Sequence, residues 1–242
     1  MMSTEAAAPE GATDAAAWGL ALASLAMARR FAAGATMWCV APRWPAHGSH
    51  VAVEFVHPVI VGKRALPAVH LEAGELVGAV RLLSCPGDIL LAIGGSGDAA
   101  VEAVVRRCEA WGLTTVWIGA GPHPSGPGAD HLIWVDGVDM ARAARSGELV
   151  LRYHLLWELT HVVFEHPGLL TTEQQCRDDV CIACSDEGRL AEITSVHDGN
   201  RAEVVAEGNV ETVDVSLVDQ ARPGDLVLVH AGVAITRVEE AR

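Results

Sequence analysis

The sequence predicts a doubly wound α/β domain with a parallel sheet, followed by a small all-β barrel. Two observations predict this organisation. Up to about residue 166, helical patterns alternate with apolar runs of strand length, as in a parallel sheet covered by helices on both faces. Beyond residue 179, short segments of alternating polarity are separated by Asp-Gly, Glu-Gly-Asn and Pro-Gly-Asp turn signals, a pattern typical of a small barrel.

The first domain is expected to span residues 14–166, behind a tail of residues 1–13 that has no periodic pattern and is expected to be disordered. Asp14 is a suitable N-cap for a helix to about Ala33, which Gly34 would end in a left-handed conformation. The remaining elements expected in this domain are strands at 36–40, 68–71, 88–93, 114–118 and 131–135, and helices at 49–57, 99–111 and 147–165.

The second domain is expected to span residues 180–242. The last helix of the first domain would end at His166-Pro-Gly, because proline cannot continue it, and residues 167–179 would form a linker. The strands expected in the barrel lie at 190–196, 202–206, 210–215, 226–229 and 233–238.

Charge and apolar content restrict the kind of partner. The 242 residues include 17 Lys and Arg against 31 Asp and Glu, a net charge of -14, which disfavours nucleic acid and anionic lipid as partners. The longest apolar stretch, Ala15 to Ala28, is too short to span a bilayer, and the acidic residues before it do not suit a signal peptide. We therefore expect a cytoplasmic protein whose partner is a protein or a small molecule.

The six cysteines form two groups. Cys39, Cys85 and Cys108 are scattered among apolar residues and are expected to be inert thiols of the core. Cys176, Cys181 and Cys184 lie within nine residues of one another. In a reducing compartment such a cluster indicates metal binding or redox chemistry more often than disulfides.

Two runs of residues relate the second domain to a known family. Cys181-Ile-Ala-Cys184 opens it, and Arg222-Pro-Gly-Asp-Leu-Val-Leu-Val-His-Ala-Gly-Val-Ala-Ile235 nearly closes it. Together they resemble the HypC/HybG/HupF hydrogenase maturation chaperones, which begin Met-Cys-(Leu or Ile)-Ala and close with Pro-Gly-Asp-x-Val-Leu-Val-His-x-Gly-x-Ala-Ile. The resemblance covers about residues 180–238 and implies a small OB-like barrel.

The resemblance implies a scaffold role for Cys181, which matches the cysteine after the initiator Met. Family members use that cysteine, together with a maturation partner of the HypD type, to hold an iron carrying cyanide and carbon monoxide, Fe(CN)2CO. They also bind the precursor of the hydrogenase large subunit. In this chain the cysteine is internal, and Cys184 replaces a small apolar residue. Zinc or an iron–sulfur cluster at Cys176, Cys181 and Cys184 therefore stays an alternative, with His197 as the nearest fourth ligand.

Residues 21–165 resemble a SIS domain of the phosphoheptose isomerase type. The resemblance rests on Pro86-Gly-Asp-Ile-Leu-Leu-Ala-Ile-Gly-Gly-Ser-Gly-Asp98, followed by a helix and Trp111-Gly-Leu-Thr-Thr-Val116. In that family the serine-rich loop after the strand binds a sugar phosphate. Here only Ser96 and Gly97 of that loop remain as candidate ligand-binding residues, and Asp98 would repel an anion. The phosphate loops are therefore expected to be degenerate.

The same resemblance implies a zinc site. Isomerases of this type bind zinc through His and Glu one helical turn apart, which match His50 and Glu54, and through a histidine of the last helix. His161 is the preferred match and His154 the alternative. The competing interpretation is that these are polar residues of a subunit interface, since SIS domains usually pair through helices and a homodimer is expected.

The sequence thus predicts a [NiFe] hydrogenase maturation chaperone rather than a catalyst. The main alternative is a sugar-phosphate isomerase or regulator with an accessory barrel. A third interpretation is a structural zinc module at the cysteine cluster.

Overall fold

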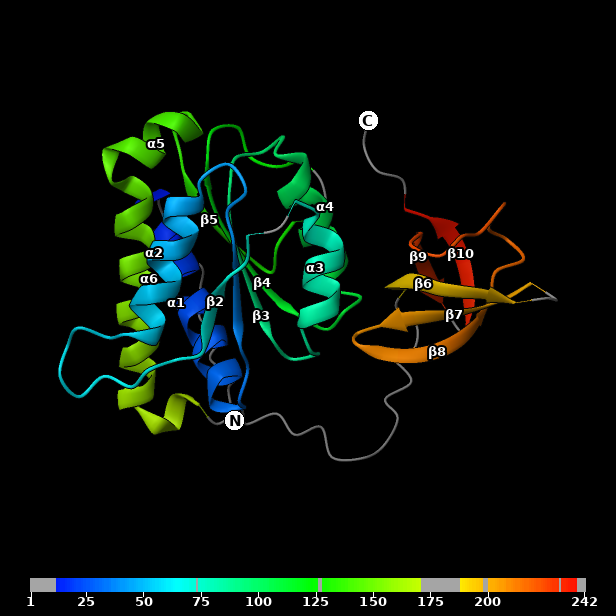
Figure 1. Cartoon of the computed structure of the whole chain (residues 1–242), viewed down its shortest axis with the longest axis horizontal. Helices are drawn as coiled ribbons and strands as arrows, with labels where there is room; N and C mark the ends of the chain where they lie inside the picture. Colours follow the sequence, from blue (N-terminus) through cyan, green and yellow to red (C-terminus); the bar gives the residue numbers. More distant parts are fainter. Residues whose placement is uncertain are drawn as a thin grey trace, which may run out of the picture.

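The computed structural model describes residues 12–72, 74–125, 128–170, 188–197, 200–230 and 232–238, with the side chains of residues 12–15 excepted. Figure 1 shows two lobes, an α/β domain on the left and a β-barrel on the right. The predicted fold class, a parallel α/β domain followed by a closed barrel, is confirmed by the strand order.

The α/β domain is built on a five-stranded sheet with the order β2-β1-β3-β4-β5, in which every neighbouring pair is parallel. The sheet therefore needs a crossover after each strand, and helices supply most of them. The strands are β1 (Met37–Val40), β2 (Ala68–His70), β3 (Ile89–Ile93), β4 (Thr114–Ala120) and β5 (His131–Val135). The helices are α1 (Ala12–Ala32), α2 (Pro45–Val56), α3 (Leu76–Leu83), α4 (Ala99–Cys108), α5 (Met140–Ser146), α6 (Glu148–Glu165) and the 3-10 turn η1 (Pro167–Leu169).

Helices cover both faces of this sheet, because its central strands have no polar face. Every residue of β3 and β4 is buried. Helices α1, α2 and α6 pack on one face, around Met27, Phe55 and Leu156. Helices α3 and α4 pack on the other face, around Val80 and Val104. Figure 1 shows these two helical layers on either side of the strands.

Most predicted elements of this domain are confirmed, but several boundaries are wrong. Helix α1 begins at Ala12, so Asp14 lies within the helix and is not its N-cap. Helix α2 begins at Pro45 rather than at residue 49, because proline at the first helical position needs no partner for an N–H. The left-handed conformation of Gly34 is confirmed by its φ of 96°.

Two short helices were not predicted. Helix α3 has eight residues and α5 has seven, so neither spans enough turns for a clear helical period. Each is instead marked at its start by an acidic side chain. Glu75 accepts a hydrogen bond from the backbone of Gly78, and Asp139 accepts one from Arg142.

The second domain is a closed barrel with the strand order β10-β8-β7-β6-β9. Its strands are β6 (Arg189–His197), β7 (Arg201–Ala206), β8 (Asn209–Asp214), β9 (Leu226–His230) and β10 (Val233–Arg237). All five lie within one or two residues of the predicted ranges. Alternate residues of the strands point inward, and small aliphatic side chains such as Ile193, Val204 and Val227 fill the interior.

The barrel packs against the α3–α4 side of the first domain. The indole N–H of Trp111, which follows α4, donates to the buried carboxylate of Glu192 on β6. Val205 and Leu226 of the barrel belong to the same apolar cluster as Trp111. The β7–β8 turn adds a backbone bond of 2.9 Å from Gly208 N to Ala110 O. The two domains therefore share a continuous apolar core.

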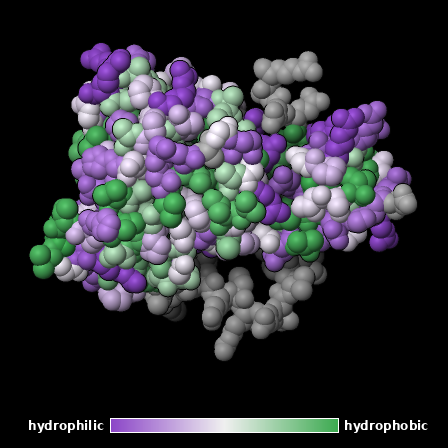
Figure 2. Space-filling view, viewed as in Figure 1, coloured by the Kyte–Doolittle hydropathy of each residue, from purple (hydrophilic) through white to green (hydrophobic). Residues whose placement is uncertain are grey.

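A loop after α2 carries an exposed apolar tip. Val59, Ile60 and Val61 are all exposed. The loop projects from the left edge of the molecule in Figure 1, and Figure 2 shows a hydrophobic surface at the same place. Exposed apolar groups that gather in this way are more typical of contact surfaces than of bare protein surface.

Within the described residues, no helix is long and apolar enough to cross a membrane.

The domain interface yields a prediction about stability. Trp111→Phe removes the N–H that serves the buried Glu192 carboxylate while it keeps most of the aromatic packing. Because the buried carboxylate then loses its hydrogen-bond donor and keeps only an ion pair of 3.8 Å with Arg81, the free energy of unfolding should fall by about 1–3 kcal/mol. Chemical denaturation of the full chain measures this change. The control is Leu82→Ala at an exposed position of α3, which should change the free energy by less than about 0.5 kcal/mol. An equal effect of both substitutions would contradict the role of the hydrogen bond.

Candidate functional site

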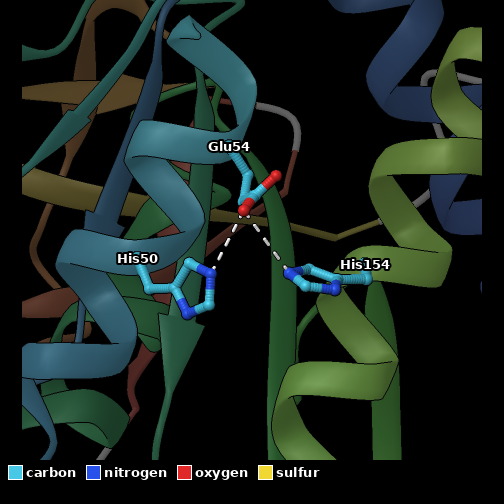
Figure 3. Close-up of side chains that lie close together, drawn as sticks. All are labelled: His50, Glu54 and His154. Atoms are coloured by element: carbon cyan, nitrogen blue, oxygen red, sulfur yellow. Dashed lines mark hydrogen bonds and ion pairs between the residues drawn. The ribbon is translucent and has the colours of Figure 1, made fainter. Parts of the chain in front are cut away.

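Helices α2 and α6 bring together two imidazoles and one carboxylate. His50 and Glu54 come from α2, and His154 comes from α6. One ligand atom from each residue lies within 4.8 Å of the others. Figure 3 shows both rings directed toward the Glu54 carboxylate from facing helices. Within the described part of the chain, this is the one group of its kind.

The pattern of buried residues on α2 sets the direction of these side chains. Val51, Ala52 and Phe55 are buried against the sheet. His50 and Glu54 are four residues apart and therefore share a different side of the helix, which faces α6. On α6, Tyr153 and Trp157 are buried while His154 is exposed. The apolar contacts of the two helices thus fix which polar side chains meet.

The three side chains converge on a single oxygen atom. Glu54 Oε1 lies 3.2 Å from His50 Nε2 and 3.6 Å from His154 Nε2. The side chains of His50, Glu54 and His154 are 40%, 21% and 45% exposed, so a small solute can reach them from solvent. The ring planes of His50 and His154 are nearly perpendicular, and their centroids lie 5.3 Å apart.

A tyrosine and a third histidine stand behind this cluster. The hydroxyl of Tyr153 lies 2.8 Å from His50 Nδ1 and 3.5 Å from His47 Nδ1. The other ring nitrogen of His47 lies 3.0 Å from the backbone oxygen of Ala144. Burial raises the pKa of Tyr153 to about 12, and the nearby charge of Glu54 acts in the same direction. The phenol is therefore neutral at physiological pH.

Two imidazoles and one carboxylate are a donor set that Zn²⁺ favours in proteins, with further positions left for water or another ligand. The residues present therefore fit a zinc ion. Among the described residues, Glu54 forms ion pairs with His50 and His154 and with no Lys or Arg. A divalent cation would balance this carboxylate.

The cluster contains His154 rather than His161, the histidine that was the preferred match to the family's ligand on the last helix. His161 is buried, and its two ring nitrogens lie 2.9 Å from Trp157 O and 3.0 Å from Arg64 O. Both nitrogens thus face backbone carbonyls, and the ring packs within the fold. Metal binding by His50 and Glu54 stays a prediction, now with His154 as the third ligand that the geometry supplies.

Sequence reasoning did not find Tyr153 or His47. Two signals were present, since Tyr153 is the one tyrosine of the chain and precedes His154, and His47 lies one turn before His50. Neither signal shows a contact between α2 and α6, because that contact depends on tertiary packing.

The predicted cysteine site, Cys176, Cys181 and Cys184, lies outside the described residues. His197, considered as a fourth ligand there, ends β6 with its Nε2 3.0 Å from Ser195 Oγ. Of the three scattered cysteines, Cys39 and Cys108 are buried, and burial raises the pKa of both thiols, as expected for inert core residues. The expectation for Cys85 is wrong, because it is exposed in the turn between α3 and β3.

The loop after β3 uses its polar groups internally. The backbone N–H of Gly97 donates to Glu102 Oε1 at 2.8 Å, and Ser96 Oγ donates to Pro122 O at 2.7 Å. The carboxylate of Asp98 is buried at the start of α4, within 3.4 Å of the position that a Cβ on Gly94 would take. Two carboxylates therefore stand at the helix end that would attract an anion.

A hollow of about 950 Å³ lies between the two domains, lined among others by Arg29, Arg30 and Glu207. Its two arginines already donate hydrogen bonds within the protein. Arg30 Nε donates to Thr114 Oγ1 at 2.8 Å, and Arg29 Nε donates to Leu169 O at 3.0 Å. Among the described residues, the hollow holds no group of three metal-ligating side chains like the cluster of α2 and α6.

Fold and site together define a two-domain protein, in which an α/β domain with a surface His and Glu cluster is packed against a closed five-stranded barrel. The model of the HupF/HypC family matches residues 188–242, which include all five strands of the barrel. The predicted resemblance is thereby confirmed for residues 188–242, while the opening run Cys181-Ile-Ala-Cys184 precedes the match. A search of curated proteins finds no match to the chain.

Solved structures similar to the chain include two phosphoheptose isomerases. The one from Francisella tularensis is 19% identical, with a TM-score of 0.49, and the similarity covers 60% of this chain and 85% of that one. The one from Neisseria gonorrhoeae is 17% identical, with a TM-score of 0.49 and coverage of 59% and 85%. The sugar isomerase domain of an RpiR transcription factor from Sphaerobacter thermophilus is 15% identical, with a TM-score of 0.45 and coverage of 63% and 81%.

The occupied loop after β3 yields a prediction about sugar phosphates. Because Glu102 holds the Gly97 amide and Asp98 adds a second negative charge, hexose and heptose phosphates should bind with a Kd above about 1 mM. Isothermal titration of the full chain measures this. Micromolar affinity would contradict the prediction, and its loss on Ser96→Ala would place the ligand at this loop.

Proposed function

We propose that the protein is a maturation factor for a [NiFe] hydrogenase and acts as an assembly chaperone rather than as a catalyst. The observation that carries the proposal is the HupF/HypC match over residues 188–242, which coincides with a closed barrel. Its proposed partners are a maturation protein of the HypD type and the precursor of the hydrogenase large subunit.

In this proposal Cys181 holds the iron of the Fe(CN)2CO group during assembly, as cargo rather than as a resident cofactor. The support is chemical and positional. A thiolate is a soft ligand suited to low-spin iron, and Cys181 precedes the barrel by a few residues, as the cysteine does in the family that the barrel resembles. Cys176 and Cys184 are available as further thiolate ligands or as an alternative zinc site.

The iron-holding role predicts the result of an affinity purification from cells that assemble hydrogenase. Wild-type protein should copurify with the maturation partner or the large-subunit precursor and show infrared bands of iron-bound cyanide and carbon monoxide. Cys181→Ala should lose the bands, because the proposed thiolate ligand is gone. Cys85→Ala is the matched control, since Cys85 is an exposed cysteine of the first domain, and it should keep them.

The outcomes of this purification separate two parts of the proposal. Wild-type protein that recovers a partner without the bands would overturn the iron-holding role and leave the chaperone role. Wild-type protein that recovers neither partner nor bands would contradict both.

For the α/β domain we propose a zinc site formed by His50, Glu54 and His154. The support is that three suitable donors lie close together and are open to solvent, and that in the described structure Glu54 forms no ion pair with a Lys or Arg. The domain is also proposed to form the homodimer and to contact protein partners. Exposed apolar side chains on α1 and α6, namely Trp18, Leu22, Leu151 and Leu155, and the tip at residues 59–61 support contacts of this kind.

The zinc site predicts binding of one Zn²⁺ by the cluster of α2 and α6. Glu54→Ala should weaken that binding by at least about 100-fold, because it removes the carboxylate on which both histidines converge. His123→Ala is the control, because His123 pairs with Asp136 away from the cluster. Competition with a chromophoric chelator, on protein carrying Cys176→Ser, Cys181→Ser and Cys184→Ser, measures the affinity at this cluster alone. Equal affinities of wild type and Glu54→Ala in that background would contradict the site.

The alternative function, a sugar-phosphate isomerase or regulator with an accessory barrel, is less well supported. In the loop after β3, the Gly97 amide and the Ser96 hydroxyl already donate hydrogen bonds within the protein. The loop between β1 and α2 carries Pro42, and Pro45 begins α2, where the family has glycines that allow a backbone to approach an anion closely.

A further inference from the structure

Three side chains form a hydrogen-bonded chain that ends at the proposed zinc site. It begins at the backbone oxygen of Ala144 and passes through His47 and the Tyr153 hydroxyl to His50. The end at Ala144 is a carbonyl oxygen, which can only accept a hydrogen bond. The ring nitrogen of His47 at that end, Nε2, must therefore carry the proton.

This outer contact determines what His47 offers to Tyr153. A neutral imidazole carries one proton, so with Nε2–H directed at Ala144 O, the Nδ1 of His47 is an acceptor. That acceptor faces the Tyr153 hydroxyl. Tyr153 can thus place its one proton on either of two histidines, and its choice decides the state of His50.

The two possible directions of the Tyr153 proton differ in what they present to a cation. If Tyr153 donates to His50 Nδ1, neutral His50 carries its proton on Nε2 and donates it to Glu54, 3.2 Å away. His50 then has no free lone pair with which to bind a cation. If Tyr153 donates to His47, His50 donates from Nδ1 to the phenol oxygen, and the Nε2 lone pair points at the cluster.

We propose that Tyr153 and His47 are positioning residues. When Zn²⁺ takes the place of the hydrogen bond between His50 and Glu54, they hold His50 in the tautomer protonated on Nδ1 and so present its Nε2 lone pair to the ion. The inference rests on the zinc site proposed above and deepens it. Metal-binding histidines commonly donate their second N–H to an oxygen acceptor that fixes both tautomer and ring orientation. Here the acceptor is the phenol oxygen of Tyr153, and the proton of that phenol can be donated to His47 Nδ1, 3.5 Å away.

The burial of these groups supports a positioning role. Tyr153 is fully buried between α2 and α6, so its hydroxyl has no bulk water to replace a missing partner. Its ring contacts His47, His50 and His154 edge-on, with centroids 6.1, 5.2 and 5.3 Å apart. The tyrosine therefore also sets the orientation of the rings that flank the cluster.

The test measures Zn²⁺ affinity by chelator competition for a set of variants of the full chain, each with the three cysteines at 176, 181 and 184 replaced by serine. Tyr153→Phe keeps the ring and removes the hydroxyl, and it should weaken binding about 10- to 100-fold. His47→Leu removes the acceptor and should weaken it comparably. Because both act through one chain, the double variant should bind about as weakly as the weaker single variant.

Two further variants separate positioning from stability. His47→Asn keeps an acceptor oxygen near the place of Nδ1 and should restore the affinity to within about threefold of wild type. Thr160→Val removes another buried hydroxyl of α6, two turns away, whose bond to Leu156 O lies within the helix, and it should leave the affinity unchanged.

A spectroscopic measurement reads the tautomer itself. In the zinc-loaded wild type, nitrogen-15 NMR of the imidazole rings should show His50 protonated on Nδ1 and His47 protonated on Nε2. Coordination of His50 through Nδ1 would overturn the proposal whatever the affinities are.

The affinities distinguish a failure of the inference from a failure of the site. If wild type and Glu54→Ala bind Zn²⁺ with equal affinity, both the zinc site and the positioning role are contradicted. Zinc binding by wild type together with an unchanged Tyr153→Phe would overturn the positioning role alone. An equal loss in Thr160→Val and Tyr153→Phe would also overturn it, because the loss would then follow from the packing of α6.

Discussion

Burial of both faces of the central strands is the constraint on which the other features of this protein depend. Strands β3 and β4 expose no residue to solvent, so each face of the sheet must be covered over its whole width. Helices α1, α2 and α6 complete one face. On the other face α3 and α4 are short, and the barrel adds Val205 and Leu226 to the apolar cluster beside Trp111. The second domain is thus part of the cover of the first.

The same constraint creates the candidate zinc site. Since α2 and α6 must both lie against one face of the sheet, their outer sides meet along a shared seam. His50 and Glu54 occupy the seam from α2, and His154 occupies it from α6. Tyr153 is buried beneath them and links the ligands to the backbone through His47. The apolar packing of the helices therefore also determines which hydrogen bonds form between α2 and α6.

The packing of the domains bears on how a chaperone of this construction would work. The face of the barrel that carries Glu192 and Leu226 is covered by the α/β domain. Partners of the barrel must then use its other faces, while the α/β domain presents its own exposed apolar tip after α2. A barrel held in this way gives a partner protein two surfaces in fixed relation, one from each domain.

The sequence by itself determined the fold class, most elements and the barrel family, because these follow from local patterns of apolar residues, turn signals and a specific closing run. It also paired His50 with Glu54, since a spacing of four residues on one helix fixes a shared side. It missed α3 and α5, which are too short for a helical period. It favoured His161 over His154, which the structure places in the cluster. The two histidines lie seven residues apart, almost two full turns, on nearly the same side of α6 and about 10 Å apart along its axis. Only the tertiary structure decided this, because the level at which α6 meets α2 depends on how both helices pack on the sheet, and that packing placed His154 beside Glu54 and buried His161 against Arg64.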